Sequence, residues 1–184
     1  AKNLAFAQGL ELVEDTSLLK EVTGLVEYPV VLMGEISKEF FDLPAEVLMT
    51  SMKEHQKFFS VKNPKTNRIE KFITVANRTT ADNGKTIIAG NQKVLFARLS
   101  DAKFFWENDL RIAKSGMIEW SEKLEKVTFH NKLGSQSDRI KRISLMACVA
   151  SKLSNADEEL AKRAAILCKV DLSSEMVGEF AKLQ

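Results

Sequence analysis

The stretch GNQKVLFARLSDAKFFWENDL, from Gly90 to Leu110, decides the fold of this chain. Its apolar residues recur at the three- and four-residue spacing of an α-helix, and its polar residues fall on the other side. The spacing predicts one long helix with an apolar stripe made of Ile88, Leu95, Leu99, Ala102, Trp106 and Leu110. The opposite face is predicted to carry Lys93, Ser100, Phe104 and Arg111.

The residues before this helix predict a small sheet with helices. A β-branched run over Leu25–Ile36 is typical of a strand, and Pro29 within it favours an edge position or a bulge. Pro44 fits the first turn of the helix that follows it. Apolar and polar residues then alternate on both sides of a turn, which predicts a hairpin over residues 58–77. The first twenty residues are predicted to be helical.

The residues after the long helix predict further helices. Ser135 and Asp138 have the spacing of a capping box that starts a helix running to about Leu153. Asn155 is predicted to cap the next helix. The fold class is therefore α+β. A small mixed β-sheet with helices is expected in residues 1–130, and an all-helical segment in residues 131–184.

The composition is that of a globular protein. Apolar residues make up 45% and charged residues 28% of the 184 residues, which argues against disorder. No apolar run approaches the roughly 18 residues that a membrane helix needs, and the first residues do not resemble a signal peptide. Cys148 and Cys168 are expected to be reduced core thiols of a cytoplasmic protein.

Charge is distributed unevenly along the chain. Residues 1–52 carry a net charge of −6, residues 53–152 one of +10, and residues 153–184 one of −2. The predicted hairpin region is the most positive, with seven basic and two acidic residues between Lys53 and Arg78. Such a segment suits the phosphate backbone of a nucleic acid, although a solvated surface with interspersed acids has the same composition.

The sequence contains no catalytic, metal-binding or nucleotide-binding motif that we recognise. His55 and His130 are the only histidines, neither lies in an HExxH motif, and no metal ligand set is predicted. GxSxG, P-loop and GxGxxG patterns are absent. Asp171 is either a carboxylate with a perturbed pKa or a helix-capping residue near Ser173.

Two aromatic strings allow more than one interpretation. EHQKFF, Glu54–Phe59, suits a polar, anionic or stacking partner, or else a helix end whose phenylalanines enter the core. Phe104, Phe105 and Trp106 cannot all face inward from one helix, and the helical wheel places Phe104 outward. Phe104 therefore lies either at an interface or beneath residues 115–134.

Several long strings occur in an order that resembles the β subunit of bacterial glycyl-tRNA synthetase. They are LVEYPVVLMGEI, FFDLPAEVLMTSMKEHQKFFSV, ITVANRT, GNQKVLFARLSDAKFFWENDL, VTFHNKLGS and AAILCKVDLSSEMVGEF. Since that family's chain is several times longer than 184 residues, the resemblance implies an internal fragment. It also implies a complete enzyme, a tetramer of two α and two β chains, that joins glycine to its tRNA with ATP and Mg²⁺.

By this resemblance the α subunit carries the catalytic core, and the β subunit handles tRNA(Gly) in the cytoplasm, with no membrane and no DNA as partner. No catalytic residue and no cofactor is therefore expected in this stretch. The segment after Gly134 is expected to begin a helical domain like that of HD hydrolases. Val170–Asp171 stands where those enzymes place His–Asp, and the family pattern EFPEL appears as EFAKL, with Ala181 and Lys182.

The sequence thus predicts the non-catalytic middle of a ligase subunit, which positions tRNA and the α subunit. The predicted tRNA contacts are basic residues of the 53–111 region: Lys57, Lys62, Lys65, Arg68, Arg98, Lys103 and Arg111. Arg98 alternatively pairs with Asp101, and Phe104 is the predicted interface residue. Two other functions stay open, a protein-interaction scaffold without RNA contact and a degenerate HD-type phosphohydrolase.

Overall fold

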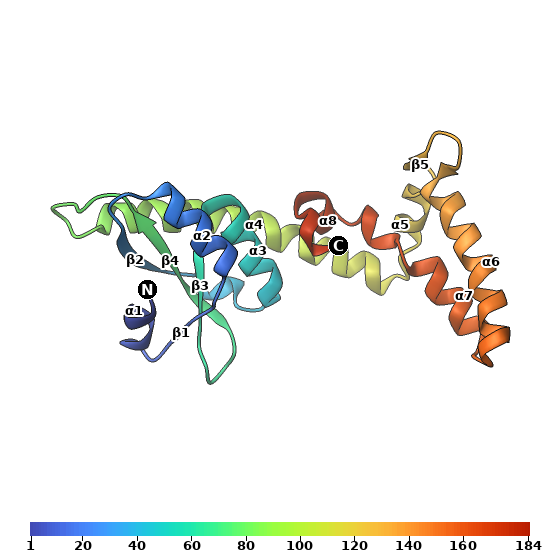
Figure 1. Cartoon of the computed structure of the whole chain (residues 1–184), viewed down its shortest axis with the longest axis horizontal. Helices are drawn as coiled ribbons and strands as arrows, with labels where there is room; N and C mark the ends of the chain where they lie inside the picture. Colours follow the sequence, from blue (N-terminus) through green and yellow to red (C-terminus); the bar gives the residue numbers. More distant parts are fainter. The chain divides into compact units, whose positions relative to one another are not determined.

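The computed structural model describes all residues, 1–184, and divides into two compact units (Figure 1). Unit 1 is Ala1–Phe104 and unit 2 is Phe105–Gln184, so helix α4 (Lys85–Lys114) contributes to both. A four-stranded sheet lies in unit 1 and a two-stranded sheet in unit 2, and every strand pairing is antiparallel. The α+β class is confirmed, whereas the domain limits near residue 130 stay a prediction.

Unit 1 is a sheet with helices on both faces. Its elements before α4 are α1 (Lys2–Phe6), β1 (Glu11–Leu12), α2 (Thr16–Leu25), β2 (Val30–Glu35), the 3₁₀ helix η1 (Lys38–Phe40), α3 (Ala45–Gln56), β3 (Phe59–Lys62) and β4 (Ile69–Ala76). The strand order β1-β3-β4-β2 puts β2 at an edge, as Pro29 predicted. The prediction of one N-terminal helix is wrong, because Gly9, at φ +69°, turns the chain from α1 into β1.

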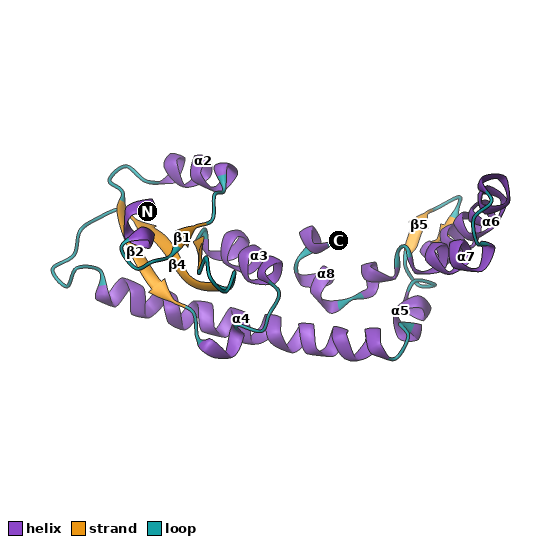
Figure 2. Ribbon diagram, turned by 90° about the horizontal axis from the view of Figure 1, so that it is seen from below, coloured by secondary structure: helices purple, strands orange, loops and turns teal.

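One face of this sheet is covered by the first two helices. Leu18 and Val22 of α2 pack in one cluster with Phe59 and Val61 of β3 and with Ile73 of β4. Figure 2 shows α2 and α4 on opposite sides of the sheet. Burying these side chains supplies about 1.5–3 kcal/mol each, so α2 is held by packing more than by its own helix propensity.

The other face is built around Phe72. This residue alternates with Ile73 along β4, is fully buried, and stacks on Phe58 with 4.5 Å between ring centroids. Gly34 of the neighbouring strand lies opposite Phe72 in the sheet register, and a Cβ at Gly34 would come within 2.3 Å of the ring. Gly34 therefore leaves the space that the ring of Phe72 occupies.

The predicted long helix is confirmed. Leu95, Leu99 and Ala102 are buried, as the stripe required, but Leu110 is 38% exposed and is not part of the buried stripe. Asp82 caps the start of α4 by accepting the N–H groups of Gly84 and Thr86, and hydrogen bonds from the neighbouring threonines lower its pKa.

Unit 2 is mostly helical. After α4 it contains α5 (Ile118–Lys123), β5 (Thr128–His130), β6 (Gly134–Ser135), α6 (Gln136–Ser154), α7 (Glu158–Leu167), the 3₁₀ helix η2 (Val170–Ser173), α8 (Glu175–Glu179) and the 3₁₀ helix η3 (Ala181–Leu183). Its core contains Ile112, Trp120, Leu124, Ile140 and Val170. The likeness of this unit to an HD hydrolase stays a prediction.

Two local predictions in unit 2 have different outcomes, and one element of the unit was not predicted. The capping box of Ser135 and Asp138 is confirmed at the start of α6. The prediction for Asn155 is wrong, since this residue ends α6 in a left-handed conformation and Asp157 caps α7. The β5–β6 hairpin was not predicted, because its strands are only three and two residues long and too short to show an alternating pattern.

A buried carboxylate closes unit 2. Asp109 of α4 is 5% exposed, and its two oxygens accept the backbone N–H groups of Glu175 at 3.0 Å and Met176 at 2.9 Å. Ser174 caps the same helix by accepting the N–H of Val177 at 3.1 Å. These contacts satisfy N–H groups that the first turn of α8 cannot satisfy itself.

We predict that Gly34→Ala destabilises the protein by about 1–3 kcal/mol, because the new methyl group collides with the fixed ring of Phe72. Denaturant unfolding measures the change. The matched control is Gly90→Ala, an exposed position within α4 where nothing lies within 4 Å of the added Cβ. That control should gain up to about 1 kcal/mol. Equal stability of the two variants would contradict the role of Gly34.

We also predict that Asp109→Ala speeds amide hydrogen exchange at Glu175 and Met176 and lowers the melting temperature. Each N–H left without an acceptor costs roughly 1–3 kcal/mol. Asn108→Ala is the control, because it removes only a surface hydrogen bond to Arg111. Unchanged exchange at the two amides would show that the carboxylate does not hold α8.

Candidate nucleic-acid interface

The basic hairpin of unit 1 is shaped by its turn. The N–H of Asn63 donates to the carbonyl of Arg68 at 2.9 Å, and the Asn63 side chain accepts the N–H of Lys65 at 2.9 Å. Asn67 takes the left-handed conformation that closes the turn. Lys65 and Arg68 are thereby exposed at the tip, as the sequence predicted for a hairpin turn.

Acidic side chains neutralise most of the predicted hairpin cations. Lys62 pairs with Glu11 at 3.4 Å, and Arg68 with Asp42 at 3.7 Å. Lys57, in a left-handed conformation after α3, pairs with Glu21 at 2.8 Å, and this hydrogen bond raises the pKa of Lys57. Lys65 forms no such pair. The positive charge counted along the sequence therefore overstates the charge that this surface offers to a phosphate.

The predicted cations fall into separate sets. Lys57 and Lys62 are held by acids of α2 and β1. Arg68 and Lys103 lie beside residues 39–42, where Lys103 donates to the Glu39 carbonyl at 3.3 Å. Arg98 is exposed on α4. In unit 2, Arg111 donates to Asn108 at 2.9 Å. These cations form separate sets within the two units, and contact with RNA stays a prediction for each of them.

A groove beside the second set was missed by the sequence analysis. It has a volume of about 610 Å³ and runs between the end of β2, η1, β4 and α4. We call it the η1 groove. Its lining includes two glutamates, Glu35 and Glu70, and three lysines and three aromatic rings: Lys38, Lys71, Lys93, Phe40, Phe41 and Phe96. The lysines and rings lie up to 58 positions apart in sequence, so only the tertiary structure brings them together.

The η1 groove combines rings with cations. Phe40 is buried, and the half-exposed Phe96 meets it edge to face at 5.3 Å between centroids. Lys71 pairs with Glu35 at 2.9 Å, and the hydrogen bond and charge of Lys71 lower the pKa of Glu35. Lys38 and Lys93 have no carboxylate within 4 Å, although the charge of Lys38 also contributes to lowering the pKa of Glu35. An ammonium group beside an exposed ring suits a nucleotide, whose phosphate and base meet the two groups.

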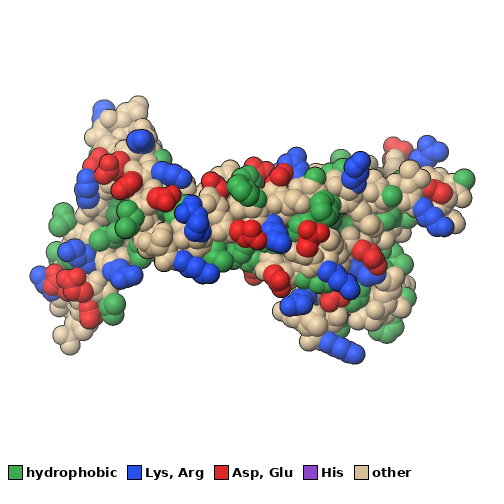
Figure 3. Space-filling view, turned by 180° about the vertical axis from the view of Figure 1, so that it is seen from behind, with side chains coloured by type: hydrophobic (Ala, Val, Ile, Leu, Met, Phe, Trp, Pro, Cys, Tyr) green, Lys and Arg blue, Asp and Glu red, His purple; other side chains and the backbone are tan.

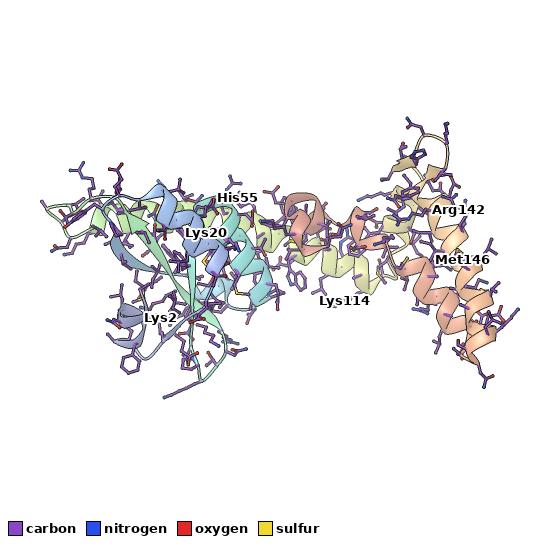
Figure 4. The ribbon with its side chains drawn as sticks, viewed as in Figure 1. Lys2, Lys20, His55, Lys114, Arg142 and Met146 are labelled. Atoms are coloured by element: carbon purple, nitrogen blue, oxygen red, sulfur yellow. The ribbon has the colours of Figure 1, made fainter.

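The two aromatic strings differ in how far their rings are buried. Phe58 and Phe59 of EHQKFF are 3% and 6% exposed, so their rings belong to the core, while His55 is exposed on α3 (Figure 4). Phe104 is 66% exposed, in agreement with the helical wheel, and its role at an interface stays a prediction.

Three residues outside the interface differ from expectation. Asp171 lies in η2 and caps no helix with its side chain, because Ser174 and Asp109 serve the start of α8. Cys168 is exposed and Cys148 is half-buried, so the prediction that both are core thiols is wrong.

No three His, Cys, Asp or Glu side chains lie close enough to hold a metal ion. None of the helices is long and apolar enough to cross a membrane.

One lysine of the positive segment is used inside the fold. Lys53 of α3 pairs with Asp15, which caps α2, and also donates to Ser17 at 2.8 Å. Burial raises the pKa of Asp15, but the hydrogen bonds from Lys53, Leu18 and Ser17 outweigh it and lower the pKa to about 2. The pair connects α2 with α3, so Lys53 is not offered to a ligand.

The chain matches the family model described as glycyl-tRNA synthetase beta subunit over residues 1–184. Among curated relatives, the glycine–tRNA ligase beta subunit of Ruegeria sp. (strain TM1040) is 69% identical over 186 residues, covering all of this chain and 27% of the relative. The corresponding subunits of Dinoroseobacter shibae and Rhodospirillum centenum are 65% and 44% identical, again over the whole chain and 26% of each relative.

The match places the chain in a class of proteins, the aminoacyl-tRNA synthetase subunits. The chain belongs to the glycyl-tRNA synthetase beta subunit family, as its sequence strings indicated. It spans about a quarter of the length of the curated relatives that it matches.

We predict that Asp15→Asn reduces the pH dependence of stability between about pH 4 and pH 2. The unfolded carboxyl has a pKa of about 3.9 and the folded one about 2, so the unfolded state binds the proton first. Stability from this group is thus present above about pH 4 and lost as pH falls through 2. Asparagine keeps the cap and removes the charge.

Unfolding free energies measured across this pH range test the prediction. The slope of unfolding free energy against pH should be shallower in Asp15→Asn, by an amount that corresponds to at most one proton bound on unfolding. Lys53→Met, which removes the main partner and retains Asp15, should flatten the slope in part. Identical slopes in all three proteins would contradict the assignment.

Proposed function

We propose that this chain is the central, non-catalytic part of the β subunit of a glycine–tRNA ligase, and that it positions tRNA(Gly) and the α subunit for ATP-dependent glycylation. The observation that carries the proposal is the family match over all 184 residues. Bond formation takes place on the α subunit, which uses ATP and Mg²⁺, and no catalytic residue is assigned to this stretch. The complete enzyme contains two α and two β chains and works in the cytoplasm.

The proposed contact with tRNA rests on the η1 groove and the cations beside it. Lys38 and Lys93 are available to phosphates without breaking an ion pair, and Lys65 is available at the hairpin tip. Binding at Lys62 or Arg68 first requires their acids to be displaced. Exposed ion pairs are worth only about 0–1 kcal/mol, so a polyanion can exchange them.

The proposed contact with protein rests on an apolar stripe of unit 2. Exposed side chains recur at helical spacing along α6 and continue on α7: Leu145, Met146, Val149, Leu153 and Leu160. Leu153 is 85% exposed and Met146 72%. Figure 4 shows Met146 on α6. An exposed stripe of this kind marks a protein–protein interface, and it favours the scaffold function as the second candidate.

We predict that replacing Lys62, Lys65 and Arg68 together by Ala weakens tRNA(Gly) binding to the assembled ligase. Each lost phosphate contact should reduce the slope of log affinity against log salt by about 0.9. Lys65→Ala alone should lower the slope more than Lys62→Ala, because Glu11 already neutralises Lys62. A salt-graded binding assay measures both.

Lys20→Ala is the matched control, since Lys20 is exposed on α2 and lies outside the predicted set. If the triple variant binds tRNA as the wild type does, the hairpin has no role in tRNA binding. If the wild-type ligase itself shows no salt-sensitive binding through this subunit, the scaffold function is the better one.

A further inference from the structure

A second basic surface lies in unit 2, on the β5–β6 hairpin and the first turns of α6. Residues 126–142 contain five basic residues and one acidic residue. The acid, Asp138, is already engaged by Ser135 and lies 3.6 Å from Lys141. The side chains from Lys126 to Leu133 are all exposed. Figure 3 shows basic side chains on the projection that this hairpin forms.

The hairpin is fixed to the helix that follows it. The N–H and hydroxyl of Ser135 donate to one oxygen of Asp138 at 3.0 and 3.1 Å, which lowers the pKa of Asp138. Arg142 donates to the carbonyl of Leu133 at 3.0 Å. Gly134 has φ +83°, and a Cβ there would lie 2.4 Å from the Asp138 carboxylate. Because an isolated two-stranded hairpin is marginally stable, these contacts hold its shape.

Phe129 combines an exposed ring with a cation. Its side chain is 37% exposed, and the guanidinium of Arg139 lies 4.4 Å from the ring centroid. Bases of single-stranded nucleic acids stack on such rings and on guanidinium planes. The core of unit 2 makes no use of this ring. The partly exposed ring of Phe129 and the guanidinium over it therefore offer a surface on which a base can stack.

The tip of the hairpin offers hydrogen-bond donors. His130 accepts the N–H of Lys132 through Nδ1 at 3.1 Å, so the neutral ring carries its proton on Nε2. The Lys132 ammonium is exposed and forms no ion pair. Arg142 lies on α6 close to the hairpin (Figure 4). Donors and cations beside a stacking ring match a base and its phosphate.

We propose that the β5–β6 hairpin, with Phe129, Lys132 and Arg139, binds unpaired nucleotides of the tRNA. This inference rests on the proposed function and adds a site that shares no residue with the η1 groove. RNA is favoured over a protein partner because basic residues outnumber acids five to one here, and lysine is depleted in protein interfaces. Unpaired nucleotides are required because only an unstacked base can cover the ring.

The test uses the assembled ligase, with the complete β subunit and its α subunit, and a tRNA(Gly) transcript. Phe129→Ala should weaken tRNA binding about tenfold to a hundredfold, the usual effect of removing one base-stacking ring. Phe129→Tyr keeps the ring and should bind nearly as the wild type. Lys132→Ala should lower the salt slope by about one. The control is Lys162→Ala, an exposed residue of α7 that lies outside the hairpin and outside the apolar stripe of unit 2.

Glycine-dependent exchange of pyrophosphate into ATP, measured without tRNA, should be unchanged in every variant. If the wild type charges tRNA while Phe129→Ala and Lys132→Ala bind it normally, the hairpin inference fails and the proposed function stands. Loss of the α subunit from Phe129→Ala on gel filtration, with tRNA affinity retained, would also overturn the inference in favour of a protein contact. A wild-type ligase that does not bind tRNA would overturn both.

Discussion

Unit 1 depends on one packing constraint, the burial of Phe72 between its stacking partner and a strand that leaves room for it. The ring lies on Phe58, at the end of α3, and above Gly34 of the edge strand β2. Three elements thus meet at one side chain. The η1 groove begins at Glu35 and Lys71, which directly follow Gly34 and precede Phe72 in the two strands. A larger residue at Gly34 would therefore disturb the strand pair that leads into the groove.

The large elements could be predicted from the sequence because each has a strong local signal. The 30-residue helix α4 has a long apolar stripe, the hairpin has a Pro- and Asn-rich turn, and the start of α6 has its capping box. The β5–β6 hairpin and the break after α1 were not predicted. Their strands contain only two or three residues, too few to show an alternation of apolar and polar side chains. The amino-acid composition of such a short segment does not predict its secondary structure when no periodic pattern is present.

The site was harder to predict because the net charge of a sequence segment does not show which of its cations are paired with acids in the folded protein. Lys53, Lys57 and Lys62 lie close together in the chain, yet each is neutralised by an acid from the negatively charged first 52 residues. The η1 groove instead draws on residues that lie far apart in sequence. Phe129 and Arg139 could have been noticed as an aromatic and a cation near a turn, but their contact depends on the hairpin.

The link between Asp109 and α8 has a consequence for how the polypeptide is made. The carboxylate and its two amide partners are 66 and 67 residues apart. At a synthesis rate of about 5–20 residues per second, Asp109 leaves the ribosome roughly 3 to 13 seconds before its partners exist. During that interval a charged group destined for the interior remains hydrated. Unit 2 therefore completes this part of its interior only after α8 has been translated.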